Sequence, residues 1–169
     1  MTRTFTMAAL ACLFLVAVPD SAEAQSRFRL DDATRTAIRT ILTDLRAQTS
    51  PLRDQIRAES QTFFDGVKAE LQLGDFQAWA VRWRLRVADF VALRAFSALP
   101  DADQTAANLS AALQAEYQKV FADLTADATQ LANLAALAQT YADAVAPLKL
   151  QIKSLAEAAR TQIQALLAP

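Results

Sequence analysis

Apolar residues recur at alternating steps of three and four along two long stretches of this sequence, and this spacing restricts the fold more than any other feature. One series runs from Ile38 to Leu71 and the other from Leu109 to Leu166. Residues three and four apart share one face of an α-helix, whereas a half-buried strand needs strict alternation. The spacing therefore predicts long amphipathic helices, each with one apolar stripe.

Turn residues are too scarce for a fold rich in β-strands. The 169 residues include 2 Gly and 5 Pro, and several short strands would need many more turn signals. Ala, Leu, Gln and Arg are abundant and favour helix. We predict an all-α fold, an elongated antiparallel bundle of four or five helices in which the long helices are kinked and resemble a coiled coil.

The first series indicates a helix from about Asp32 to Leu73. Asp31 or Asp32 is the expected N-cap and Gly74 the expected stop. Pro51 lacks a backbone N–H, so we expect a kink or break there.

The second series is too long for one straight helix in a single domain. Thr125 and Pro147 are the expected break points, and the pattern leaves open whether one or both interrupt the helix. Residues 101–104, Asp-Ala-Asp-Gln, follow Pro100 and resemble a capping box that opens the third helix.

The first 24 residues have the pattern of a cleavable signal peptide. Arg3 supplies a positive charge, residues 7–18 form an apolar run, and residues 22–24 read Ala-Glu-Ala. The run is shorter than the roughly 20 residues that span a bilayer. We predict cleavage after Ala24, a periplasmic or secreted protein, and a single helical domain over residues 25–169.

The chain beyond this segment lacks His, Cys and Met. Imidazole zinc sites, thiolate metal sites and His-dependent nucleophiles are therefore excluded for it. Arg3, Asp20 and Glu23 lie in the segment, so the remaining charges cancel, which argues against nucleic acid as a partner. Neighbouring acids such as Asp101 and Asp103 are interpreted as caps. We expect no enzyme activity, catalytic residue, metal site or cofactor.

Residues 81–87, Val-Arg-Trp-Arg-Leu-Arg-Val, alternate like a strand, but their flanks lack turn residues and no other segment could pair with them. Wound as a helix, residues 76–99 carry two apolar arcs with arginines at the borders. Both arcs can be core, or one can stay open to bind apolar, negatively charged segments of other proteins. The candidate residues for such binding are Phe76, Trp79, Arg82, Trp83, Arg84, Arg86 and Phe90.

Two segments share the form Pro-Leu-basic-x-Gln-Ile-basic. They are residues 51–57 and 147–153. Two explanations stay open. The match arose by chance, because the chain is rich in Ala and Gln, or two related helical units pack around a pseudo-twofold axis.

Two further segments carry a resemblance to a known family. Residues 30–34, Leu-Asp-Asp-Ala-Thr, and residues 124–128, Leu-Thr-Ala-Asp-Ala, are similar to the Leu-Thr-x-x-Gln motifs of the Spy/CpxP family of periplasmic stress proteins. Thr34 and Ala128 stand where that family has Gln, and Asp31 replaces the first Thr. The resemblance covers residues 28–140. It implies a cradle-shaped helical homodimer that binds unfolded proteins without ATP.

Three classes of function follow. The first is an exported, ATP-independent chaperone-like or client-binding envelope stress protein. The second is a structural coiled-coil or bundle protein without clients, whose aromatic residues are core or dimer interface. The third is a protein that lies on lipid surfaces through amphipathic helices, which the neutral charge and the scarcity of Lys disfavour. The sequence leaves the oligomeric state and the clients open.

Overall fold

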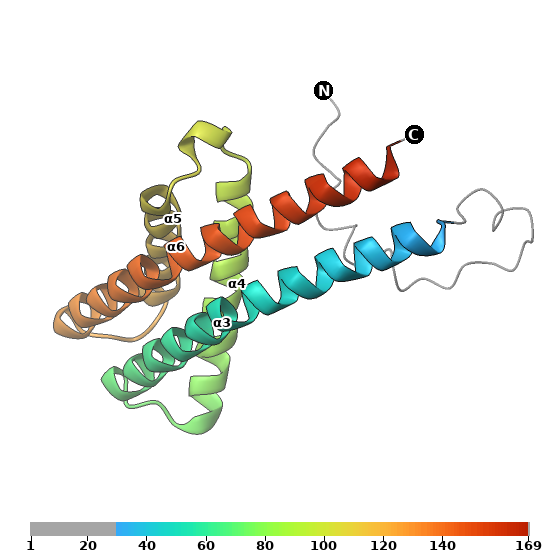
Figure 1. The fold of residues 1–169 in the computed structure, drawn as a ribbon. Coiled ribbons are helices and arrows are strands. Elements are labelled where there is room, and N and C mark those ends of the chain that lie inside the picture. Colours follow the sequence, from blue (N-terminus) through green and yellow to red (C-terminus); the bar gives the residue numbers. More distant parts are fainter. Residues whose placement is uncertain (1–29, 169) are drawn as a thin grey trace, which may run out of the picture. The chain divides into compact units, whose positions relative to one another are not determined.

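The computed structural model describes residues 30–168 and contains four α-helices and one short 3₁₀ helix. In chain order these are α3 (Asp32–Glu70), α4 (Asp75–Ser97), η1 (Asp101–Asp103), α5 (Ala106–Ala122) and α6 (Ala128–Leu167) (Figure 1). Residues 30–168 include no strand, so the all-α prediction is confirmed. The expected signal peptide, residues 1–24, lies outside the described residues.

The two longest helices continue through their prolines. Pro51 lies inside α3 and Pro147 inside α6, each as the twentieth residue of its helix. Of the kink or break expected at Pro51, the break is ruled out, and of the two break points considered for the second series Pro147 does not interrupt the helix. Each proline removes one helical hydrogen bond to the carbonyl four residues earlier, on Ala47 or Asp143. Both of these residues are exposed, so water can bond the freed carbonyl oxygen and the helix persists.

The turn between α3 and α4 differs from the one that the sequence suggested. Helix α3 begins behind Asp31, whose carboxylate accepts a hydrogen bond from the Thr34 N–H at 2.7 Å. It ends at Glu70, and Gln72 adopts a left-handed φ of 50° that reverses the chain. Gly74 is the N-cap of α4 and not the stop of α3.

The capping box predicted at residues 101–104 is also wrong, because that segment forms η1. Side-chain amides hold it as a turn: Gln104 donates to the Leu99 carbonyl at 2.8 Å and Asn108 donates to the Asp103 carbonyl at 2.6 Å. Helix α5 starts after Thr105, whose hydroxyl accepts from the Asn108 N–H.

The chain breaks between α5 and α6 near Thr125, as expected. A capping box opens α6 there. The Asp127 carboxylate accepts from the Gln130 N–H at 2.8 Å, and the Gln130 side chain accepts from the Asp127 N–H at 3.0 Å. The long apolar series from Leu109 to Leu166 is thus divided between two helices.

Three aromatic rings from three helices meet in the core. Phe63 of α3 stacks on Tyr141 of α6 with ring centroids 4.7 Å apart, and Tyr117 of α5 lies within 6 Å of both rings. Their burial fixes α3, α5 and α6 against one another.

Asp89 connects α4 to this core through partly buried polar contacts. Its carboxylate accepts hydrogen bonds from the Tyr117 hydroxyl and from Lys149 Nζ. The Tyr141 hydroxyl in turn bonds Ser60 on α3 at 3.0 Å. Such contacts specify how α4 is rotated about its own axis, because each buried polar group needs its partner.

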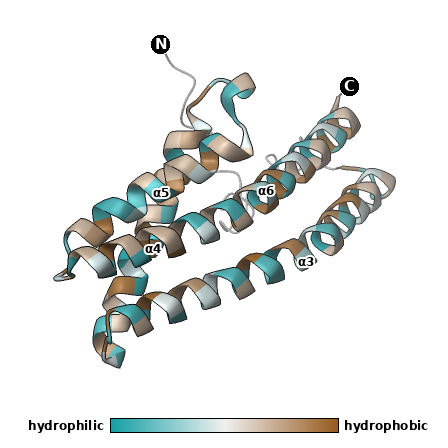
Figure 2. Ribbon diagram, turned by 90° about the vertical axis from the view of Figure 1, so that its left-hand side faces the viewer, coloured by the Kyte–Doolittle hydropathy of each residue, from teal (hydrophilic) through white to brown (hydrophobic). Residues whose placement is uncertain are grey.

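Residues 37–70 of α3 and helix α6 lie side by side and antiparallel (Figures 1 and 2). Near the α3–α4 turn they approach closely, since a Cβ at Gly66 would meet Leu137 at 3.1 Å. In residues 37–56 of α3 and residues 148–167 of α6, the buried side chains are those of Thr49 and Ala159. The large core residues therefore belong to the other halves of these helices.

Candidate functional site

Four of the five aromatic side chains of α4 face solvent. Phe76 is 79% exposed, Trp79 63%, Trp83 59% and Phe90 66%. At 100° per residue, these side chains fall within an arc of about 120° on one side of the helix. Val87 and Val91 lie on the same arc and are exposed as well. We call these six residues the aromatic face.

The opposite side of α4 is the buried one. Its members are small or aliphatic, apart from one Phe, and comprise Val81, Leu85, Ala88, Ala92 and Phe96. Both expected apolar arcs of this helix are present. Leu99, which helical spacing assigned to the same arc as Val81 and Leu85, lies beyond α4 and is exposed. Residues 37–168 do not bury the aromatic arc.

Exposure on this scale is unusual for aromatic residues. Complete burial of a Phe or other large apolar side chain stabilises a fold by about 1.5–3 kcal/mol, and the free domain gains little of that on the aromatic face. Contiguous exposed apolar surface commonly marks a site of interaction. Within the face, Phe76 and Trp79 stack on each other with ring centroids 6.1 Å apart.

The predicted arginines border the aromatic face but differ in their surroundings. Arg84 forms an ion pair at 2.5 Å with Asp123, the C-cap residue of α5. Arg82 turns towards α3, where its guanidinium lies 4.8 Å from the Phe64 ring centroid. Arg86 is exposed and has no hydrogen bond or ion pair with any residue in 30–168.

The sequence prediction missed Arg94. It lies four residues after Phe90 and is exposed, so helical spacing places it on the aromatic face itself. The same spacing rule, extended by one turn beyond Phe90, would have found it.

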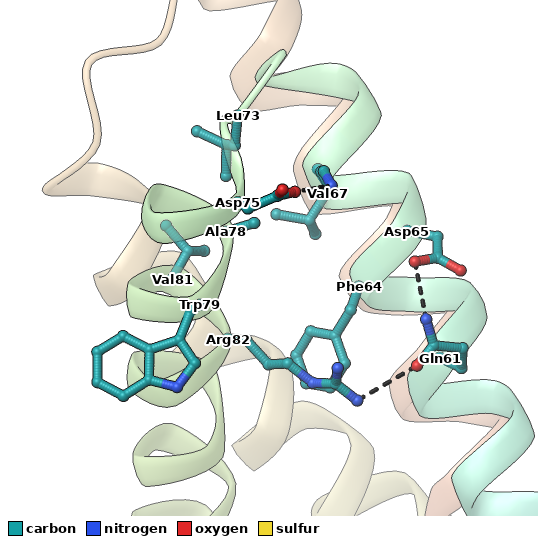
Figure 3. Close-up of a pocket in the computed structure, with 11 residues that line it drawn as sticks. Gln61, Phe64, Asp65, Val67, Leu73, Asp75, Ala78, Trp79, Val81 and Arg82 are labelled. Carbon is teal, nitrogen blue, oxygen red and sulfur yellow. Dashed lines mark hydrogen bonds and ion pairs between the residues drawn. The ribbon is translucent and has the colours of Figure 1, made fainter.

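A cleft of about 310 Å³ opens between α3 and α4 beside Trp79 (Figure 3). Its apolar lining includes Phe64 and Val67 of α3, with Ala78 and Val81 of α4. The Trp79 indole forms one side, and Arg82 over Phe64 forms the other. This cleft was not predicted, because its lining comes from two helices and the sequence does not say which residues of each face the other.

Four charged side chains also line the cleft. Lys68 Nζ and Asp75 Oδ1 form an ion pair at 2.7 Å; this hydrogen bond lowers the pKa of Asp75 and raises that of Lys68. The amide of Gln61 lies between the other two, accepting from Arg82 Nη2 at 3.2 Å and donating to Asp65 Oδ1 at 2.8 Å.

The aromatic face and the cleft offer apolar and charged side chains for contact with a ligand. Among residues 30–168 no group of three or more acidic, His or Cys side chains could hold a metal ion. Within the same range, none of the helices is long and apolar enough to cross a membrane. Comparisons with protein-family models, with curated proteins and with solved structures found no match.

Proposed function

We propose that this protein binds apolar, acid-flanked segments of other proteins through the aromatic face of α4, as an exported, ATP-independent chaperone-like or client-binding protein. The observation that supports this proposal is the outward position of Phe76, Trp79, Trp83 and Phe90 on a helix whose opposite side is well packed. A periplasmic location and a relationship to the Spy/CpxP family remain predictions.

The charges around the face favour an acidic partner. Arg82, Arg84, Arg86 and Arg94 all belong to α4, and the two acids of that helix are already engaged: Asp75 with Lys68 and Asp89 with Lys149. Carboxylates of a bound segment would therefore meet arginines whose planar guanidinium groups suit bidentate contact.

The same charges disfavour a second copy as the cover. In an antiparallel pair of α4 helices centred on Trp83, Arg82 of one copy lies level with Arg84 of the other, and no free acid of α4 compensates. Like charges placed together at an interface suppress association. The structural alternative, in which the aromatic face is a symmetric dimer interface, is thus the weaker one.

Tryptophan fluorescence tests the proposal directly, because the chain has 2 Trp and both lie on the aromatic face. The probe is a Trp-free synthetic peptide of repeating Glu-Leu-Phe-Glu units. We expect a blue shift of the emission and slower acrylamide quenching on titration. The shift should vanish when Ser replaces Leu and Phe, and weaken when Lys replaces Glu.

Variants locate the binding on the face. Phe90→Ser removes one large apolar contact. It should therefore raise the Kd of the peptide by a factor between about 10 and about 100. Leu42→Ser is the matched control, because Leu42 is an exposed apolar residue on α3, and it should bind as the unsubstituted protein does.

Three results would contradict the proposal. Emission that is unchanged by every peptide refutes protein-segment binding. A blue shift with anionic phospholipid vesicles but with no peptide would favour the lipid-surface alternative. A dimer by size-exclusion chromatography with light scattering, with emission already blue-shifted in that dimer, would favour the structural alternative.

A further inference from the structure

The cleft between α3 and α4 is continuous with the aromatic face, because Trp79 belongs to both. Resting on the proposed function, we infer that this cleft holds one apolar side chain of the bound segment, and that a carboxylate next to that side chain pairs with Arg82. The ligand is thus a segment in which a Phe or a large aliphatic residue stands beside Asp or Glu.

The lining fits such an anchor. Phe64 and Trp79 both line the cleft, with the Arg82 side chain drawn between them, and Val67, Ala78 and Val81 complete its apolar lining (Figure 3). The volume of about 310 Å³ lies at the lower end of the range of ligand pockets, about 300–1,000 Å³. It has room for one large side chain and its adjoining backbone. Anchors of this kind carry most of the affinity in many protein interfaces.

Of the cleft's two positive charges, Arg82 is the one that lacks a counter-ion. Its Nη2 donates to the neutral Gln61 amide, and no carboxylate in residues 30–168 lies within ion-pair distance of it. Its Nε is buried and has no hydrogen-bond acceptor. Lys68, in contrast, is already paired with Asp75. A carboxylate arriving with the anchor would therefore pair with Arg82 rather than with Lys68.

Asp65 also lines the cleft and bears on this argument. It accepts from the Gln61 amide, which stands between it and Arg82. Gln61 thus separates the two charges, and Arg82 keeps donors for a second acceptor because a guanidinium carries five N–H groups. The neutral amide leaves the charge of Arg82 available to the ligand.

Filling the cleft is the first test. Ala78→Phe places a ring in the cleft, and Ala115→Phe is the matched control on the exposed surface of α5. The probe is a fluorescein-labelled Gly-Ser peptide with one Phe between two Glu, measured by anisotropy. We expect Ala78→Phe to weaken binding at least about tenfold, as replacement of the peptide's Phe by Ala does, and Ala115→Phe to leave it unchanged.

A double-mutant cycle between Arg82 and the Glu residues of the peptide provides the second test. It does not depend on whether Ala78→Phe folds. Arg82→Gln should weaken binding of the Glu peptide about tenfold, the effect of one charge-assisted hydrogen bond. It should change binding of the matching Gln peptide by less than about twofold. Arg160→Gln, on the exposed surface of α6, should bind both peptides normally. Circular dichroism and urea unfolding verify that each variant is folded.

The outcomes separate this inference from the function on which it rests. If folded Ala78→Phe and Arg82→Gln bind the Glu peptide as tightly as the unsubstituted protein, the anchor assignment is wrong while binding at the aromatic face stands. If Arg82→Gln weakens binding of the Glu peptide and of the Gln peptide equally, the proposed pairing of Arg82 with a carboxylate is also wrong. Absence of peptide binding by the unsubstituted protein would overturn both proposals.

Discussion

The two sides of α4 have similar apolar character but opposite surroundings. The buried side carries Ala88 and Ala92 near its centre, and the exposed side carries Trp79 and Trp83. Small side chains let the backbones of neighbouring helices come close together, whereas an indole would hold them apart. Size, more than hydropathy, thus decides which side of this helix packs against α5.

This difference separates stability from binding on one helix. The buried side supplies packing in the free domain, and its polar neighbour Asp89 fixes the rotation of α4. The exposed side contributes little to folding, so its aromatic surface is available to a partner. Substitutions on the two sides should therefore have different and separable consequences.

The largest effect is expected on the buried side. Leu85 is 1% exposed, so Leu85→Ala removes packed methyl groups and leaves a cavity. We expect the free energy of unfolding to fall by about 2–5 kcal/mol. Val87→Ala, two residues away but on the aromatic face, should change it by less than about 0.5 kcal/mol. Urea denaturation of both variants measures the contrast, and equal losses would mean that the two sides do not differ.

High pH should lower the free energy of unfolding, because the core to which the buried side of α4 belongs also contains Tyr117 and Tyr141. The chain has 2 Tyr, and both are buried in the core. Burial, followed by the nearby Asp89 carboxylate, raises the pKa of Tyr141 to about 12 and that of Tyr117 further. An unfolded Tyr has a pKa of about 10, so the unfolded chain releases these protons first. Stability is then complete below about pH 10 and falls as the pH rises towards 12 and beyond.

Ultraviolet absorbance of tyrosinate measures this transition, since no other Tyr contributes. We expect tyrosinate to appear together with the loss of helical circular dichroism, because the protons leave when the core opens. Titration near pH 10 with the helical signal intact would show that the two hydroxyls are accessible to solvent.

A smaller effect is expected from Trp83→Gln. Trp83 is 59% exposed, so the free energy of unfolding should change by less than about 0.5 kcal/mol. Binding of the Glu-Leu-Phe-Glu peptide should weaken about tenfold, because one aromatic contact is lost. Urea unfolding and peptide anisotropy give the two numbers. A large loss of stability with unchanged binding would reverse the roles assigned to the two sides.

Local features of this fold were predictable from the sequence. The spacing of Val81, Leu85 and Ala88 and that of Phe76 and Trp83 each define a helical arc, since the geometry of a helix is the same in every protein. The break near Thr125 follows from capping chemistry close by in the chain. These interactions involve residues within a few positions of one another.

Features that depend on distant residues were not predictable. Which arc of α4 is buried depends on how closely α5 approaches, and the cleft depends on Arg82 reaching Gln61, 21 residues earlier. The continuity of α3 through Pro51 depends on solvent access to the Ala47 carbonyl. The small side chains of Ala88 and Ala92 were the available signal for the packed side, and periodicity alone does not weigh size.

The smallest expected effect concerns the border between the two sides, where Arg84 pairs with Asp123. Both side chains are well exposed, and surface pairs of this kind contribute about 0–1 kcal/mol. Asp123→Asn should therefore alter urea unfolding by less than about 1 kcal/mol. It should also release Arg84 for the partner and raise affinity for the Glu peptide about two- to threefold, the equivalent of roughly 0.5 kcal/mol. The gain should disappear with the Lys peptide and at high salt, where exposed charges are screened. Unchanged affinity for the Glu peptide would mean that Arg84 stays with the domain, and that the acidic flanks of a bound segment meet the remaining arginines of α4.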